Sequence, residues 1–223
     1  MLAFILSKIN LLILVMAIFS IVAFFAMGLT DIVKVKAASE LAFRVSEKAS
    51  SLFASSAYCV GDAYELDPAL EIAGGEHYYV LKVSVQNVTS ASGKALNDLI
   101  FSVYPREEIK KAFEDATYVP KSISARDFRS EAQIHLFSRT YDGKDYSGAF
   151  AEPVASKREI YADPQAVTPV DTLHMIRQVK EGKTDLYIVA CNSAVCIAQL
   201  SDVAALAGKK DGFDCQKGKG GSS

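Results

Sequence analysis

Apolar side chains fill the first part of the chain without interruption. From Ile9 to Thr30 there is no charged residue. As a helix these 22 residues would be about 33 Å long, close to the roughly 30 Å hydrocarbon core of a bilayer. A cleaved signal peptide is the alternative, but its apolar region is usually shorter and ends at a small-residue cleavage site. No convincing cleavage triplet follows this run, so we expect a retained membrane helix.

A helical pattern continues past the apolar run. Gly28 is the only glycine in the first sixty residues, and the first proline is Pro68, so nothing local ends the helix early. The sequence predicts one helix over residues 1–56, roughly 80 Å long, apolar all round over 9–30 and amphipathic over 31–56. Apolar residues of the second part recur every three or four positions, at Ile32, Val35, Ala38, Ala42, Val45, Ala49 and Leu52.

Beyond Cys59 the pattern changes to strands and turns. Residues 77–87 alternate between apolar and polar side chains, which predicts a half-buried strand. Pro105 fits the start of a short helix at 106–115. Further strands are expected at 96–104, 132–141, 172–179, 185–191 and 196–200.

The short turns between the last three strands favour antiparallel pairing. The predicted fold class is therefore α+β, with a long N-terminal hydrophobic and amphipathic helix followed by an antiparallel β-rich head domain. The head covers residues 57–208. A tail rich in glycine and lysine follows at 209–223, and we expect it to be mobile and tethered by Cys215.

All four cysteines lie outside the apolar segment, and an even number in an exported domain suggests two disulfides. Cys191 and Cys196 flank a four-residue tip between two expected strands, so they would face each other at a distance that a disulfide accepts. Zinc is the alternative for this spacing, although no second pair of ligands accompanies it. Four cysteines allow three pairings. With Cys191 joined to Cys196, Cys59 would pair with Cys215.

The charges beside the apolar run do not decide which side of the membrane holds the head, because Lys8 precedes it while Lys34 and Lys36 follow. The cysteines favour the outside. Asn87 begins the sequon Asn-Val-Thr and is a candidate glycosylation site. The formal net charge of −2 gives no basic footprint, so we expect no nucleic-acid partner.

Residues suited to catalysis are few. His77, His135 and His174 each lie in a strand-like segment, and no zinc-protease helix motif or serine elbow occurs. Asp142 and Asp145 flank a glycine as in a calcium loop, but the twelve-residue pattern is absent and a plain turn is expected. We therefore expect no enzyme, no catalytic residues, no metal and no cofactor.

This layout resembles archaeal type IV pilin-like proteins. In that family an apolar N-terminal helix anchors the precursor in the membrane and later packs into a filament core, with a β-rich head outside. The resemblance covers the whole chain as an architecture and rests on no specific motif. The fifth residue is Ile5, where most pilins have glutamate, and the residues around Lys8 do not match the usual charged leader.

The resemblance implies a structural subunit of an extracellular filament, held in the membrane before assembly. Its partners would be copies of itself, with the head free to contact surfaces or other cells. The expected helix-packing residues are Leu12, Val15, Phe19, Val22, Ala26, Gly28, Ile32, Val35, Leu41, Val45 and Leu52. The alternative is a single-pass, membrane-anchored extracellular binding domain that does not form filaments, and a surface enzyme is a third, weaker hypothesis.

Overall fold

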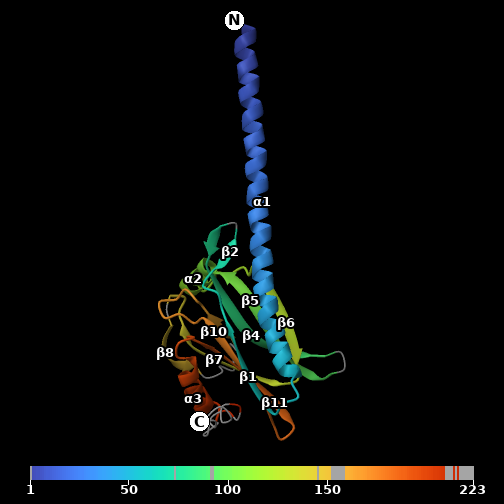
Figure 1. Ribbon diagram of the computed structural model, residues 1–223, viewed down its shortest axis with the longest axis vertical. Coiled ribbons are helices and arrows are strands. Elements are labelled where there is room, and N and C mark those ends of the chain that lie inside the picture. The colour runs from blue at the N-terminus through green and yellow to red at the C-terminus, as the bar shows by residue number, and fades with distance from the viewer. Residues whose placement is uncertain are drawn as a thin grey trace, which may run out of the picture.

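The computed structural model describes residues 2–72, 74–90, 93–144, 146–151 and 159–208, together with Phe213 and Cys215. Its largest element is α1 (Leu2–Ala54), a single helix of 53 residues. The first half of α1 projects well beyond the rest of the molecule, and the second half lies along the β-rich head (Figure 1). The predicted α+β fold, with a long N-terminal helix and a β-rich head, is confirmed.

Four antiparallel strands form the sheet against which α1 packs. Their order is β6 (Ser124–Ser130), β5 (Ala95–Pro105), β4 (Tyr79–Thr89) and β9 (Glu159–Ala162). Register places Val83 opposite both Phe101 and Ile160, and all three are buried. The alternation in β4 and β5 therefore turns one face of this sheet towards the core. α2 (Arg106–Glu114) follows β5 directly, as predicted from Pro105.

The second sheet has the order β1 (Cys59–Glu65), β10 (Thr172–Lys180), β11 (Lys183–Cys191), β7 (Gln133–Tyr141) and β8 (Tyr146–Ala151). β10 and β11 form the expected hairpin, and its turn residues Glu181 and Gly182 both have positive φ. This turn conformation matches the twist of antiparallel strands. Pairing is antiparallel except between β7 and β11, which run parallel. A small hairpin of β2 (Leu70–Ile72) and β3 (Gly75–His77) lies apart from both sheets.

One core lies between the two sheets and the second half of α1. The helix contributes six buried residues to it: Ala38, Leu41, Ala42, Val45, Ala49 and Leu52. Their spacing places them on one face of the helix. Ile32 and Val35 continue the same stripe in sequence, but they remain 65% and 50% exposed. The head therefore covers the stripe only from about residue 38 onward.

The strand expected at 196–200 is also wrong, because these residues begin the helix α3 (Cys196–Leu206). Its buried residues Cys196, Leu200 and Val203 recur at helical spacing and cover the outer face of the second sheet. β11 consequently has both faces covered, which explains its unbroken run of buried residues from Leu186 to Cys191. The predicted mobility of the tail concerns residues that the structure does not describe. Phe213 is described, and it is fully buried on this face.

Candidate functional site

The exposed half of α1, residues 9–29, is apolar on every side. Its described large apolar side chains keep between 41% and 72% of their surface exposed. Monomeric soluble proteins rarely leave so large an apolar surface uncovered. Within the described residues, α1 is the one helix long and apolar enough to cross a membrane. This surface therefore requires contact with lipid or with other protein.

Apart from Ala26, the expected helix-packing residues divide into a buried group and an exposed group. Leu41, Val45 and Leu52 are buried in the head, so their partners belong to the same chain. The side chain of Ala26 lies outside the described residues. The remaining residues are exposed, namely Leu12, Val15, Phe19, Val22, Gly28, Ile32 and Val35. The structure thus brings only the last part of the predicted set into contact with the head.

The cysteines are joined as Cys191–Cys196 and Cys59–Cys215, the pairing expected from the sequence. The Cα atoms are 5.3 Å apart in the first pair and 5.1 Å apart in the second, within the usual range for disulfides. Cys196 starts a helix here and does not face Cys191 across a strand hairpin. With all four sulfurs bonded, the alternative zinc site has no thiolate ligands.

The three histidines lie on different strands and do not converge. His135 Nε2 is 3.1 Å from Asp185 Oδ1, and the ring stacks on Tyr187 with centroids 4.8 Å apart. His174 lies on β10 in the second sheet, whereas His77 lies on β3 in the small hairpin. Among the described residues, no three His, Cys, Asp or Glu side chains come together as a metal site would require.

Two further sequence candidates lie on the surface. The Lys144 backbone N–H donates to Asp142 Oδ1 at 2.9 Å, and Gly143 between them has φ of +84°, which is the geometry of a turn. Asp145 lies outside the described residues. Asn87 is exposed on β4, as glycosylation requires, and its modification stays a prediction.

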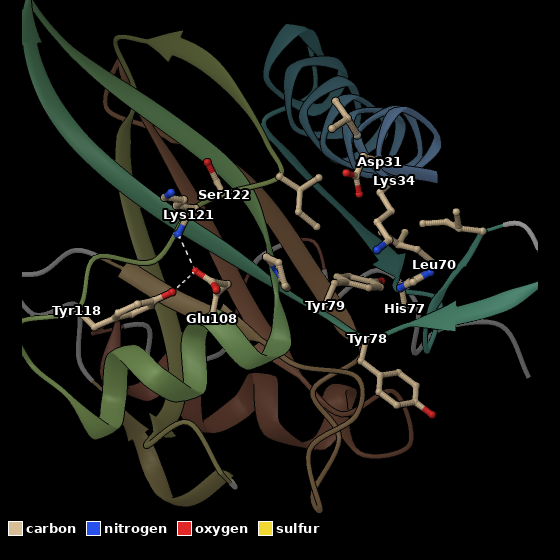
Figure 2. Close-up of a pocket in the computed structure, with 14 residues that line it drawn as sticks. Asp31, Lys34, Leu70, His77, Tyr78, Tyr79, Glu108, Tyr118, Lys121 and Ser122 are labelled. Atoms are coloured by element: carbon tan, nitrogen blue, oxygen red, sulfur yellow. Dashed lines mark hydrogen bonds between the residues drawn. The ribbon is translucent and has the colours of Figure 1, made fainter. Parts of the chain in front are cut away.

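A pocket of about 690 Å³ lies where α1 leaves the head, and the sequence did not predict it. Figure 2 shows Asp31 and Lys34 on α1 at one side, Tyr118 and Lys121 from the segment after α2 at the other, and Tyr79 between them. These residues come from segments far apart in the chain. No local pattern could have placed them together.

Hydrogen bonds order one wall of this pocket. Glu108 Oε2 accepts from the Tyr118 hydroxyl at 2.6 Å and from the Lys121 backbone N–H at 3.2 Å. These bonds, the one from Tyr118 above all, hold the pKa of the Glu108 carboxyl below its ordinary value, so it stays ionised. At the floor, the Tyr79 hydroxyl donates to the Asp67 carbonyl at 2.7 Å, and burial raises the pKa of Tyr79.

No protein-family model, curated protein or solved structure matches this chain. Its class is therefore defined by its own architecture: a disulfide-bonded α+β head on a long helix whose free half is apolar. The apolar helix indicates membrane anchoring or secretion, and the disulfides indicate an extracellular head.

Proposed function

We propose that this chain is a structural subunit of an extracellular type IV pilus-like filament, assembled through the exposed half of α1. The head faces outward and contacts surfaces or cells. The observation that carries the proposal is the continuity of α1, which is one helix on both sides of the point where it leaves the head. A filament repeats one subunit geometry along its length and needs a fixed angle between core helix and head.

The surface of the exposed half suits burial among several neighbouring helices. Its large apolar side chains point in all directions, so lipid or helices must cover every side. Small residues, among them Ala17, Ser20 and Ala23, allow other helices to approach closely. Before assembly the same apolar surface is accommodated by the bilayer, since the uncharged run matches its thickness.

The alternative is a membrane-anchored extracellular binding domain that does not assemble. The matching length of the apolar run favours it equally. It differs in one requirement, because an anchor only has to keep the head near the bilayer, and a flexible joint serves that purpose as well as a rigid helix. The two functions can therefore be distinguished by whether the chain needs a rigid helix at residues 30–31.

The test is an insertion of Gly-Ser-Gly-Ser between Thr30 and Asp31, expressed in the same host cells as the native chain. Material sheared from the cell surface is examined by electron microscopy, and membrane fractions are probed for the chain. We expect filaments from the native chain and none from the insertion variant, with both precursors retained in the membrane fraction.

The matched control is the same insertion after Val167, which is 83% exposed in the segment between β9 and β10. This variant should still form filaments, since only the head surface changes. Filaments from the Thr30 variant at native yield would contradict the need for a rigid helix at residues 30–31. A native chain recovered only as a monodisperse detergent-extracted particle would reject the filament.

A further inference from the structure

The pocket at the base of the head lies at the level of the membrane surface. Thr30 is the last residue of the uncharged run, and Lys34 is four residues further along α1, about 6 Å at 1.5 Å per residue. The polar headgroup layer on each side of a bilayer is roughly 5–8 Å thick. With residues 9–30 in the hydrocarbon, the α1 wall of the pocket lies within the headgroup layer.

Two lysines line the pocket on opposite walls. Lys34 extends from α1, and Lys121 belongs to the segment between α2 and β6 (Figure 2). Within the described residues, neither ammonium lies at ion-pair distance from a carboxylate. Lys121 interacts electrostatically with Glu108, but the charge of Glu108 is also engaged by Tyr118, by a backbone N–H and by Lys111 at 3.9 Å.

We propose that this pocket binds the headgroup of a membrane phospholipid, with Lys34 and Lys121 contacting its phosphate. Lysine is a common phosphate ligand, and each basic residue near a bilayer surface adds about 1 kcal/mol of attraction to anionic lipid. The carboxylate of Asp31 would repel a free anion such as inorganic phosphate. It can accept a hydrogen bond from the hydroxyl or amino group that a headgroup carries beyond its phosphate. Tyr78 at the rim fits the aromatic layer found at membrane interfaces.

Continuity with the membrane segment selects lipid as the occupant. The pocket wall and the apolar run are parts of one helix, so headgroups surround the opening whenever the chain is inserted. The inference goes beyond the proposed function, since it concerns the membrane-inserted subunit and holds for a pilin precursor or for an anchored ectodomain. Filament assays and lipid assays can therefore fail independently.

The first test measures lipid retention by native mass spectrometry. The full chain is placed in nanodiscs of uncharged galactolipid that contain some phosphatidylglycerol, then released from them. We expect one retained phosphatidylglycerol on the native chain, and at least fivefold less on the double variant Lys34→Gln, Lys121→Gln. The control Lys36→Gln removes the same charge two residues along α1, outside the pocket, and should retain lipid as the native chain does.

Three outcomes of this test would overturn the proposal. Absence of retained lipid on the native chain is the first. Equal loss in Lys36→Gln is the second, because it would indicate general attraction to basic residues. The third comes from adding inorganic phosphate: if millimolar phosphate displaces the lipid completely from the native chain, the lysines bind a free anion and not a headgroup.

The second test locates the pocket relative to the bilayer. The chain has no tryptophan, so Tyr78→Trp and Tyr58→Trp each create a single fluorescent probe. Tyr58 is 82% exposed beyond the far end of α1, about 35 Å along the helix from Asp31. A nitroxide on the lipid headgroup should quench the probe at 78 several-fold more than the probe at 58. Equal quenching of the two probes contradicts the proposal, provided that circular dichroism shows both variants folded.

Discussion

The exposed half of α1 (residues 9–29) and its packed half (residues 38–52) have the same secondary structure and opposite environments. The exposed half is the more apolar of the two, yet its described large side chains are 41–72% exposed. In the packed half, a stripe that includes three alanines is almost completely buried against the sheets. Small side chains let that part of the helix lie close to the strands, and its polar residues face outward.

The difference shows that apolarity alone does not indicate which residues form the core of this chain. The packed half is covered by its own head, so its residues contribute to the free energy of folding. The exposed half has its partner outside the chain, in lipid or in other subunits, and its residues contribute to insertion or assembly. Substitutions in the two halves should therefore affect different measurements.

The largest expected effect separates the two halves directly. Val45 is fully buried, and Val45→Asp places a carboxylate in the core without a partner, which should cost at least about 5 kcal/mol and unfold the head. Near-ultraviolet circular dichroism of the full chain in detergent measures this loss.

The matched control is Val22→Asp, at a position that is 58% exposed. It should leave the unfolding midpoint of the head unchanged and instead disfavour membrane insertion by about 2.5–3.5 kcal/mol, measured as the fraction extracted by alkaline carbonate. If both variants destabilise the head equally, the two halves are not independent.

A smaller effect concerns the disulfide that ties the tail to the segment after the packed half. Cys59 and Cys215 are 156 residues apart, whereas Cys191 and Cys196 are 5 apart. In the chain-entropy model, replacing the first pair by serine should cost about 5 kcal/mol, and replacing the second pair about 2 kcal/mol. Denaturant unfolding of the two double variants measures both. A larger loss from the short loop would show that the α3 junction, and not the tail, limits stability.

The smallest effect is a pH dependence at the packed half. Lys48 on α1 forms an ion pair with Asp62 on β1, and its hydrogen bond is the main cause that lowers the pKa of Asp62. Because the folded pKa is lowered, this stabilisation is present at neutral pH and is lost as the pH falls below about 4. The pair is half exposed, so we expect less than about 1 kcal/mol.

Thermal unfolding of Asp62→Asn and the native chain measures this contribution. The two midpoints should differ at pH 7 and converge near pH 3. Glu47→Gln, at an exposed position on the same half of α1, serves as the control and should show no such convergence. A constant difference between Asp62→Asn and the native chain at every pH would assign the effect to packing rather than to charge.

Several elements could be predicted because their causes are local. α1 needs only an uncharged run and the absence of proline, and both are visible in the sequence. Alternation and turn residues were sufficient for β4, β5, β10 and β11. β1 and β6 were missed because both are edge strands: Gly61 and Asp62 interrupt the first, and alternating charges dominate the second.

By itself, then, the sequence determined that a long helix exists, that its first part must meet an apolar environment, and that strands and cysteines follow it. The tertiary structure alone decided that packing starts at Ala38, that Cys196 begins a helix, that β7 and β11 run parallel, and that Lys34 and Lys121 share a pocket. The reason is physical. Periodicity records which way a side chain faces along its own element, whereas contacts between distant segments depend on how the elements pack together.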